Sequence, residues 1–353
     1  MPGSIDRRHF IAQGTAAAMW LAAPLSARAA AFPRYRISDL GDLGGSTISV
    51  RGINDAGVAV GMATRHDLDK AGVAFICDGG PMRGLRMEKR SVSSAAAAIN
   101  NAGVVAGYDV DRADAHFTHS AWTWNGSARQ YFTKQALTDS TYTTDINDDG
   151  VVTGFVYPSA AVLWRDGQLI DLSTETGLSF VQANALNHAG DVVGVALGRK
   201  RRFQSCLYRH GAATLLDIFG TPEHEATDIN AAGQVCGRYT QVVDERRCYG
   251  YLWQDGVATE LGQLPGPEQA IFPAALNDAG MVVGTSVVTA LVSPRVPHAF
   301  VWQNGSMVDL NRLIDGDRDG WVLNKAVDIN NQNQIVGQAT RHGVPRAFIA
   351  TPV

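Results

Sequence analysis

The chain has 353 residues, of which 45% are hydrophobic and 18% are charged, and its formal net charge is −4. This composition is typical of a soluble globular protein and excludes the strongly basic character expected of a nucleic-acid-binding protein. After residue 31 there is no run of about 18 apolar residues, so no transmembrane helix is predicted in the body of the chain. The length alone would suggest two or three domains, but β repeats often run this long as one domain.

The first thirty residues differ from the rest. Asp6–Ile11 contains a pair of arginines and precedes a mildly apolar run, Gly14–Leu25, and Ala27–Ala29 offers small residues for cleavage. The segment resembles a twin-arginine export signal, although Asp6 stands where Ser or Thr is usual. An ordinary Sec signal is the alternative. We expect a signal over residues 1–30, a mature chain from Ala30 or the next residue, and a periplasmic or extracellular protein that crosses the membrane already folded.

Four cysteines remain in the mature chain: Cys77, Cys206, Cys236 and Cys248. An even number of cysteines in an exported protein permits disulfides. Cys236 and Cys248 fall on successive predicted strands and are the pair to consider. The alternative, which we favour, is that the thiols are buried as small hydrophobic groups. Their spacing fits no zinc motif.

A short pattern recurs along the chain: an apolar residue, Asn, two residues, Gly, and then a Val-rich stretch. The Asn residues of its seven copies are Asn54, Asn100, Asn147, Asn187, Asn230, Asn277 and Asn330. The first and last are 330 − 54 = 276 residues apart over six intervals, so the mean period is 46. A period in this range indicates a propeller or a solenoid. Asn and Gly are the residues that a tight turn between two strands requires. The last copy has Asn333 in place of Gly, and Asn is the next best residue at positive φ.

Each unit continues, in chain order, with a loop, an aromatic strand, a tight turn and a strand near Asp-Leu. The predicted aromatic strands with their turns cover residues 74–80, 121–126, 161–167, 206–211, 251–256, 298–305 and 346–350. The final strand is clear at residues 169–172, 259–262 and 307–310. Aromatic and β-branched residues bounded by Asn-Gly or Asp-Gly are a strong hairpin signal. Each unit is therefore predicted to be a four-stranded antiparallel meander, with strands a to d.

The two ends of the chain indicate a closed ring. The seventh unit stops at Thr351–Val353 without its fourth strand, and the chain begins with a spare strand, Tyr35–Gly41. If the spare strand completes the last blade, no open sheet edge remains, whereas a solenoid would need polar caps instead. The sequence thus predicts an all-β fold over residues 31–353: one domain that is a seven-bladed β-propeller of four-stranded antiparallel blades. Neither a WD dipeptide nor a kelch double-Gly pattern recurs.

The recurring turn pattern and the literal tripeptide His298–Phe300 resemble the HAF-repeat extracellular proteins. The resemblance covers about residues 35–353, nearly the whole mature chain. It implies an exported repeat protein with no established activity, and it carries over no catalytic residue.

The two faces of such a ring are expected to differ. The a–b and c–d turns lie at one end of the strands and are short, so we call this end the turn face. The b–c loops and d–a connections lie at the other end, which we call the loop face, and they are long and varied. Function usually lies on variable loops held by a rigid scaffold. Basic groups gather on these loops, at Arg199–Arg202, Arg246–Arg247, Arg65–His66, Arg341–His342, and Arg295 with His298. They could bind a polyanion, but solvated loops are the favoured interpretation.

Two acidic segments could hold a metal. Asp109, Asp111, Asp114, His116 and His119 crowd the second predicted b–c loop. Asp315–Gly320 resembles the start of a calcium loop, but Ala326 stands where the twelfth-position carboxylate is expected. We predict no cofactor, and leave calcium or another divalent cation as the alternative.

The innermost strands should line an axial channel. The positions five before each repeat Asn are Ser49, Ala95, Tyr142, Gln182, Glu225, Phe272 and Lys325. The positions three before it are Arg51, Ala97, Thr144, Asn184, Thr227, Ala274 and Val327. The polar members predict a small-ligand site at the channel mouth, and a water-filled, ion-paired channel is the alternative. The candidate ligand-binding residues are Arg51, Tyr142, Gln182, Asn184, Glu225 and Lys325.

No nucleophile elbow, phosphate-binding Gly loop or paired His motif on a helix is present. No catalytic residue is therefore predicted. The first hypothesis is an exported binding scaffold that recognises an extracellular polymer, a small ligand or a protein through its loop face. The alternative is a lyase or hydrolase acting on a carbohydrate-type substrate at the channel mouth, with Arg51, Tyr142, Glu225 and Lys325.

Overall fold

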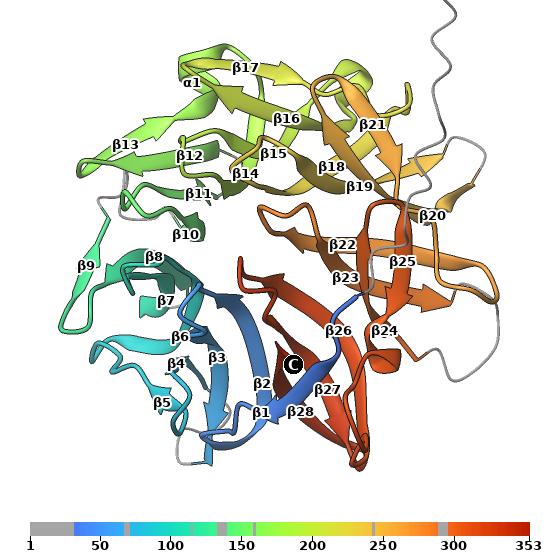
Figure 1. The fold of residues 1–353 in the computed structure, drawn as a ribbon. Coiled ribbons are helices and arrows are strands. Elements are labelled where there is room, and N and C mark those ends of the chain that lie inside the picture. Colours follow the sequence, from blue (N-terminus) through green and yellow to red (C-terminus); the bar gives the residue numbers. More distant parts are fainter. Residues whose placement is uncertain are drawn as a thin grey trace, which may run out of the picture.

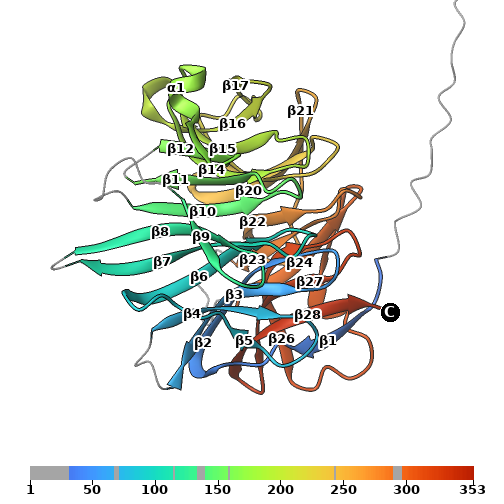
Figure 2. The same cartoon turned by 90° about the vertical axis from the view of Figure 1, so that its left-hand side faces the viewer.

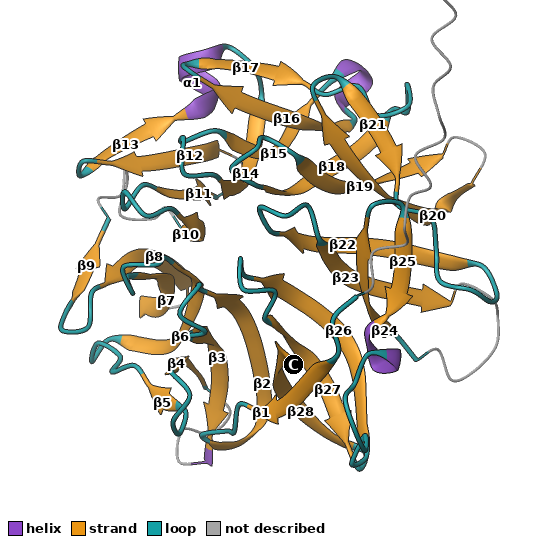
Figure 3. Ribbon diagram, viewed as in Figure 1, coloured by secondary structure: helices purple, strands orange, loops and turns teal. Residues whose placement is uncertain are grey.

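The computed structural model describes residues 32–66, 71–113, 116–132, 140–157, 160–241, 244–288 and 296–353. These residues form seven four-stranded antiparallel sheets arranged around a central axis (Figure 1), as predicted. Figure 3 shows strands through nearly the whole ring, with short helices at its rim. The predicted export signal lies outside the described residues. In the part of the chain that is described, no helix has the length and apolarity needed to span a bilayer.

The first four blades follow one another along the chain. Blade 1 contains β2 (Gly44–Ile53), β3 (Ala59–Arg65), β4 (Gly72–Cys77) and β5 (Arg83–Gly84). Blade 2 contains β6 (Ser91–Ile99), β7 (Val105–Ala113), β8 (His116–Trp124) and β9 (Arg129–Tyr131). Blade 3 contains β10 (Thr141–Ile146), β11 (Val152–Val156), β12 (Ala160–Arg165) and β13 (Gln168–Asp171), followed by α1 (Leu172–Thr176). Blade 4 contains β14 (Phe180–Leu186), β15 (Val192–Leu197), the 3₁₀ helix η2 (Arg199–Arg201), β16 (Phe203–Arg209) and β17 (Ala212–Leu215).

The last three blades complete the ring. Blade 5 contains β18 (Glu223–Ile229), β19 (Val235–Gln241), β20 (Asp244–Gln254) and β21 (Val257–Glu260). Blade 6 contains β22 (Gln269–Leu276), β23 (Val282–Val288), β24 (His298–Gln303) and β25 (Ser306–Asp309), followed by the 3₁₀ helix η3 (Leu310–Arg312). Blade 7 contains β26 (Trp321–Ile329), β27 (Ile335–Arg341) and β28 (Val344–Pro352), and its fourth strand is β1 (Tyr35–Asp39).

The ring closes between the two ends of the chain, as the spare strand predicted. β1 pairs antiparallel with β28, with Tyr35 opposite Pro352 and Asp39 opposite Phe348. Figure 1 shows this junction where the blue β1 lies against the red β28. The pairing satisfies the outer edge of β28, which would otherwise expose unpaired backbone groups.

The hydrophobic core is divided among the blade interfaces. Seven clusters of buried apolar side chains lie between successive blades, including one between blade 7 and blade 1 that contains Val336 and Phe75. Each blade therefore buries apolar area against two neighbours, and the seven sheets pack face to face around the axis. The large c-strand aromatics contribute most to these clusters, with Trp122, Tyr251 and Phe300 fully buried.

The repeat Asn forms the predicted a–b turn. In blade 1 the Asn54 side-chain oxygen accepts a hydrogen bond from the Val58 backbone N–H at 3.0 Å, and the Gly57 N–H donates to the Asn54 carbonyl at 2.9 Å. Gly57 has φ +78°, a conformation that disfavours residues with a Cβ. In the seventh copy Asn333 takes the same conformation with φ +59°, which confirms the interpretation of that substitution.

The same Asn side chains also join neighbouring blades, which the sequence interpretation did not foresee. Each amide nitrogen donates to the backbone carbonyl of the repeat Asn in the next blade, at 2.8–3.3 Å, so that seven hydrogen bonds form a closed ring. All seven Asn residues are buried. Buried polar groups that find partners hold a unique arrangement, so this ring fixes the a–b turns of all seven blades relative to one another.

Every innermost strand carries a β-bulge at one position, three residues before the repeat Asn. The glycine seven residues after the Asn lies beside this bulge on strand b. At Gly237, an added Cβ would lie 2.2 Å from the Glu225 carbonyl oxygen and 2.4 Å from the Tyr251 hydroxyl. The second glycine of the repeat is therefore required by close approach to strand a and to the aromatic residue of strand c.

The loop face differs from the prediction in one respect. The second, fifth and seventh b–c segments are not long loops. β7 continues to Ala113 before β8 begins at His116, and β19 continues to Gln241 before β20 begins at Asp244. β27 is joined to β28 by a tight turn at His342 and Gly343. Asp109 and Asp111 therefore lie on a strand, where alternation with Tyr108 and Val110 continues the pleat. Figure 2 shows the β7–β8 hairpin projecting beyond its neighbours.

The four cysteines are free thiols. Cys236 faces Leu252 across the β19–β20 ladder, whereas Cys248 faces Thr240, so the two cysteines do not pair. Burial raises the pKa of the Cys206 thiol to about 12. Cys77, Cys206 and Cys236 are buried, as the favoured interpretation of small hydrophobic groups expects, whereas Cys248 is half-buried.

Candidate functional site

The axial channel contains a cavity of about 260 Å³. All seven residues at the position three before the repeat Asn line it, including the candidates Arg51 and Asn184. Neither polar group is isolated, because Arg51 donates to the Tyr108 hydroxyl at 3.2 Å and Asn184 donates to the Ala226 carbonyl at 2.7 Å. The sequence thus identified one layer of the channel wall correctly.

The β-bulges add a second layer that strict alternation concealed. The residue two before each repeat Asn also lines the cavity, and in blades 3, 5 and 7 this residue is aspartate: Asp145, Asp228 and Asp328. The other four blades have only Gly or Ala there. The tripeptide Asp-Ile-Asn, which occurs at all three places, was the available sequence signal. The channel therefore holds three carboxyl groups that sequence reasoning missed.

Each of these carboxyl groups links two blades. One oxygen of Asp328 accepts a hydrogen bond from the Ile329 N–H of its own blade, and the other accepts from the Ile53 N–H of blade 1, both at 2.8 Å. Asp145 and Asp228 make the same pair of bonds with blades 4 and 6. Loss of hydration raises the pKa of Asp145 to about 6 and that of Asp328 to about 7, and it raises the pKa of Asp228 as well.

The candidates five positions before the repeat Asn have mostly found partners within the protein. The Tyr142 hydroxyl lies 2.8 Å from the Nδ1 atom of His119. One oxygen of Glu225 accepts two hydrogen bonds from the Arg238 guanidinium, at 2.6 and 3.0 Å. These two bonds hold the Glu225 carboxylate in place beside Arg238. This geometry supports the alternative of an ion-paired channel more than a free general base at Glu225.

Gln182 and Lys325 occupy the corresponding positions in blades 4 and 7. Gln182 is half-buried and Lys325 is exposed, and each faces the second strand of its blade, opposite Val195 and Gln338. Neither lines the axial cavity described above, whereas Arg51 and Asn184 do. The six predicted ligand-binding residues are therefore divided between two levels of the channel, and their role in binding stays a prediction.

Part of the charge of the predicted basic clusters is paired with neighbouring acids. Three of their arginines form ion pairs on the loop face, Arg202 with Glu223, Arg247 with Glu268 and Arg341 with Asp319. Arg295 and the side chains of Arg199 and Arg246 lie outside the described residues. Pairing of this kind supports the interpretation of charged, solvated loops over that of a polyanion site.

The acidic residues of blade 2 form a network with donors. Asp109 is fully buried and accepts hydrogen bonds from the Trp122 indole at 2.9 Å and the Tyr131 hydroxyl at 2.6 Å, and it pairs with Arg129. Asp111 accepts from the Ser120 hydroxyl at 2.7 Å. Asp114 and the side chain of His116 lie outside the described residues.

The calcium-like segment is an exposed turn in which Asp319 pairs with Arg341, which lowers the pKa of that carboxyl. Within the described ranges, no group of three or more His, Cys, Asp or Glu side chains is arranged to hold a metal ion. The expectation of no cofactor, with a divalent cation as the alternative, stays a prediction.

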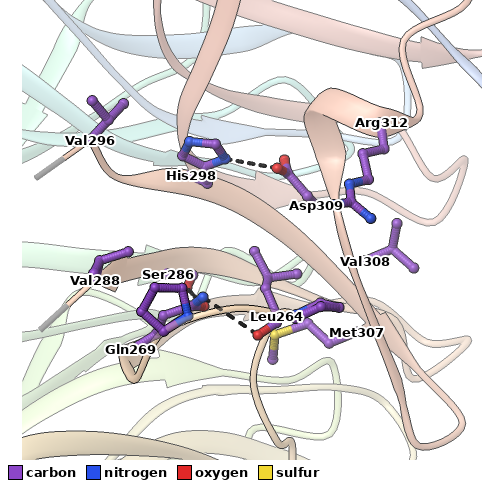
Figure 4. A pocket seen from close by; sticks show the side chains of 12 residues that line it. Leu264, Gln269, Ser286, Val288, Val296, His298, Met307, Val308, Asp309 and Arg312 are labelled. Atoms are coloured by element: carbon purple, nitrogen blue, oxygen red, sulfur yellow. Dashed lines mark hydrogen bonds and ion pairs between the residues drawn. The ribbon is translucent and has the colours of Figure 1, made fainter. Parts of the chain in front are cut away.

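A pocket of about 410 Å³ lies on the loop face of blade 6, and we call it the blade 6 pocket. Its wall comes from the connection between blades 5 and 6, from the loop-face ends of β23 and β24, and from β25 with the helix η3. Figure 4 shows His298, Asp309 and Arg312 along one side, and Leu264, Gln269 and Ser286 along the opposite side. Sequence reasoning placed His298 on this face but missed the pocket.

The imidazole of His298 is held by a carboxylate. Its Nδ1 atom lies 2.7 Å from Asp309, whose other oxygen accepts hydrogen bonds at 2.9 Å from the backbone N–H and the side-chain amide of Asn311. Asp309 thereby both caps the helix η3 and orients the imidazole of His298. Among the described residues no hydrogen bond is made at the Nε2 atom of His298, so this edge of the imidazole can contact a ligand.

Solved structures of low sequence identity share the fold. The β-propeller domain of the Trilobed protease from Pyrococcus furiosus, which has an open velcro topology, matches with a TM-score of 0.50 and 13% identity over 80% of this chain and 100% of that chain. The Pyrococcus horikoshii acylaminoacyl peptidase matches with a TM-score of 0.52 and 14% identity over 84% of this chain, but the match spans only 50% of the peptidase. TolB from Acinetobacter baumannii matches at 0.46 and 11% identity, over 83% and 63% of the two chains. At these identities the first two matches show a shared fold and nothing more.

Among curated proteins no sequence matches this chain. A family model described as a protein of unknown function, DUF3466, matches residues 36–221. That range runs from β1 through the whole of blade 4, and it covers more than half of the chain. The chain therefore belongs to the DUF3466 family of proteins of unknown function.

Proposed function

We propose that this protein is an exported propeller scaffold of the HAF-repeat type that recognises an extracellular or envelope ligand through its loop face. The observation that carries the proposal is the distribution of exposed aromatic residues. Among the described residues, the exposed large aromatics are Phe117, Tyr157, Phe203 and Phe219, with 47–65% of their surface accessible. All four lie at b–c ends or d–a connections, which is the loop face.

Exposed aromatics of this kind support a binding role because burying them against a partner removes a large apolar area from water. Phe117, Tyr157 and Phe203 come from blades 2, 3 and 4, so they follow one another around the ring. Phe219 has φ +54° and packs its ring 5.1 Å from that of Tyr239. A positive φ is unfavourable for a bulky residue, and strain of this kind gathers at functional sites.

Export is the second part of the proposal and rests on residues 1–30. Cell fractionation should place the wild-type protein outside the cytoplasm, and replacement of the twin arginines, Arg7→Lys with Arg8→Lys, should retain the precursor in the cytoplasm. Export of the double variant at the wild-type level would contradict the twin-arginine route, because twin-arginine recognition depends on that pair.

Binding is tested with the mature protein on a glycan array and against an extract of the producing cell's envelope. The triple variant Phe117→Ser, Tyr157→Ser and Phe203→Ser should lose at least about tenfold in affinity for whatever the wild type retains. Val257→Ser is the matched control, because Val257 is 67% exposed but lies at a c–d turn on the opposite face. Equal losses in both variants, or turnover of a substrate with no stable binding, would overturn the proposal.

A further inference from the structure

The blade 6 pocket has an apolar lining at its mouth and sides. Leu264 and Pro265 come from the connection between blades 5 and 6, Val288 and Val296 flank the b–c segment, and Met307 lies on β25. Val296 is 40% exposed, although it is a large apolar residue. A pocket of about 410 Å³ with such a lining is of the size and character that takes a small organic molecule.

The polar groups on one side of the pocket satisfy one another. The Ser286 hydroxyl donates to the Gln269 side-chain oxygen, and the Gln269 amide nitrogen donates to the Leu264 carbonyl at 3.4 Å. Both side chains are buried, with 3% and 5% of their surface exposed. Because these side chains bond within the protein, this side of the pocket has few free hydrogen-bond donors for a ligand.

The negative charge of the pocket is likewise engaged. Asp309 contacts His298 through one oxygen and accepts two hydrogen bonds from Asn311 through the other. Arg312, three residues further along, is exposed and makes no side-chain hydrogen bond or ion pair with another residue in the described part of the chain. The guanidinium at the pocket rim is thus a cation whose five donors have no acceptor among the described residues.

Blade 7 shows what happens when the same acidic position pairs with arginine instead. Asp39 of blade 7 is equivalent to Asp309 of blade 6, because each lies opposite the aromatic residue of strand c, Phe348 or Phe300. Two residues before that Phe, blade 7 has Arg346 and blade 6 has His298. Arg346 pairs with Asp39 at 3.2 Å. In blade 6 histidine engages the acid, and the separate Arg312 stays available at the pocket.

We propose that the blade 6 pocket binds a small amphiphilic carboxylate, with the apolar body against the Leu264 and Val296 walls and the carboxylate on Arg312. Guanidinium matches a carboxylate with two parallel hydrogen bonds, and adjacent apolar walls strengthen that pairing by excluding water. This inference rests on the pocket alone and is independent of the envelope ligand proposed above.

Calorimetry with octanoate tests the inference, and octan-1-ol serves as the uncharged ligand of the same length. The wild-type protein should bind octanoate more tightly than octan-1-ol. Arg312→Gln should weaken octanoate at least about tenfold and leave octan-1-ol unchanged, whereas Val296→Ser should weaken both. Arg346→Gln is the matched control, since it removes the same charge at the equivalent pair of blade 7, and it should bind octanoate like the wild type.

Three results would overturn the inference: no octanoate binding to the folded wild type at millimolar concentration, equal affinity in Arg312→Gln, or an equal loss in Arg346→Gln. Thermal unfolding of each variant checks its folding, and Arg312 is exposed, so its replacement should shift the unfolding temperature little. If the protein binds the envelope ligand but not octanoate, this inference fails while the proposed function stands.

Discussion

The two ends of the strands differ in how closely the blades resemble one another. At the turn face every blade contributes the same group, an Asn whose side chain bonds the next blade, and all seven are buried. At the loop face the equivalent positions diverge, as His298 in blade 6 and Arg346 in blade 7 show. A ring that must close tolerates little variation in the groups that set its geometry, whereas loops beyond it are free to vary. Regularity in this protein therefore marks structure, and departure from regularity marks candidate sites.

The largest effect should come from the regular part of the repeat. Gly237→Ala should destabilise the protein by about 3 kcal/mol, because the new Cβ would collide with strand a and with Tyr251. Gly256→Ala is the control: Gly256 has φ +88° and nothing within 4 Å of the added Cβ, so only backbone strain of about 1 kcal/mol is expected. Urea unfolding measures both, and a smaller loss at Gly237 than at Gly256 would contradict the close-packing argument.

The Asn ring should give the next largest effect. Asn100 donates to the Asn147 carbonyl at 2.9 Å and accepts from the Val104 N–H at 2.8 Å. Asn100→Ala should cost about 2 kcal/mol in unfolding free energy, because it leaves buried backbone groups without partners. The neighbouring Asn101 also bonds adjacent blades, through Asp55 and Asp148, but its hydrogen bonds are exposed to solvent. Asn101→Ala should therefore cost less, about 0.5 kcal/mol, because water can replace the lost partner. Normal binding of the envelope ligand by both variants would support the conclusion that the turn face is structural and the loop face binds. A selective loss of binding in Asn100→Ala would contradict that conclusion.

The channel carboxyl groups should give the smallest effect, seen as a pH dependence of stability. The pKa of Asp328 is about 7 in the folded protein and about 3.9 in an unfolded chain. Between these values the folded state holds more protons. Its stabilising contribution is complete below about pH 4 and is lost as the pH rises through about 7. The melting temperature should therefore be higher at pH 6 than at pH 8, with a contribution of about 1.4 kcal/mol from this group.

Asp328→Asn should flatten that slope, and calorimetric melting at the two pH values measures it. Asp319→Asn is the control. Arg341 lowers the pKa of Asp319, so this carboxyl titrates below the compared pH range and its replacement should leave the slope unchanged. A wild-type melting temperature that rises from pH 6 to pH 8, or an unchanged slope in Asp328→Asn, would contradict the placement of this carboxyl deep in the channel.

The candidate site was predicted only in part. Alternation along the strands located Arg51 and Asn184 on the channel wall. It could not locate Asp145, because a bulge inserts one residue and turns the next side chain onto the same wall. Nor could it show that Glu225 is held by Arg238, or that Asp109 lies on a strand within a buried network.

The sequence by itself determined the number of blades, the order of strands in each blade and the closure of the ring by Tyr35–Asp39. These follow from local chemistry: turns need Asn and Gly, strands need alternating or aromatic residues, and a missing strand at one end needs a spare at the other. Only the tertiary structure decided how the blades are joined and where the pockets lie. The Asn ring, the aspartates that bridge blades and the blade 6 pocket each combine groups from separate blades or connections. Contacts of that kind depend on the relative placement of distant segments, which no local pattern encodes.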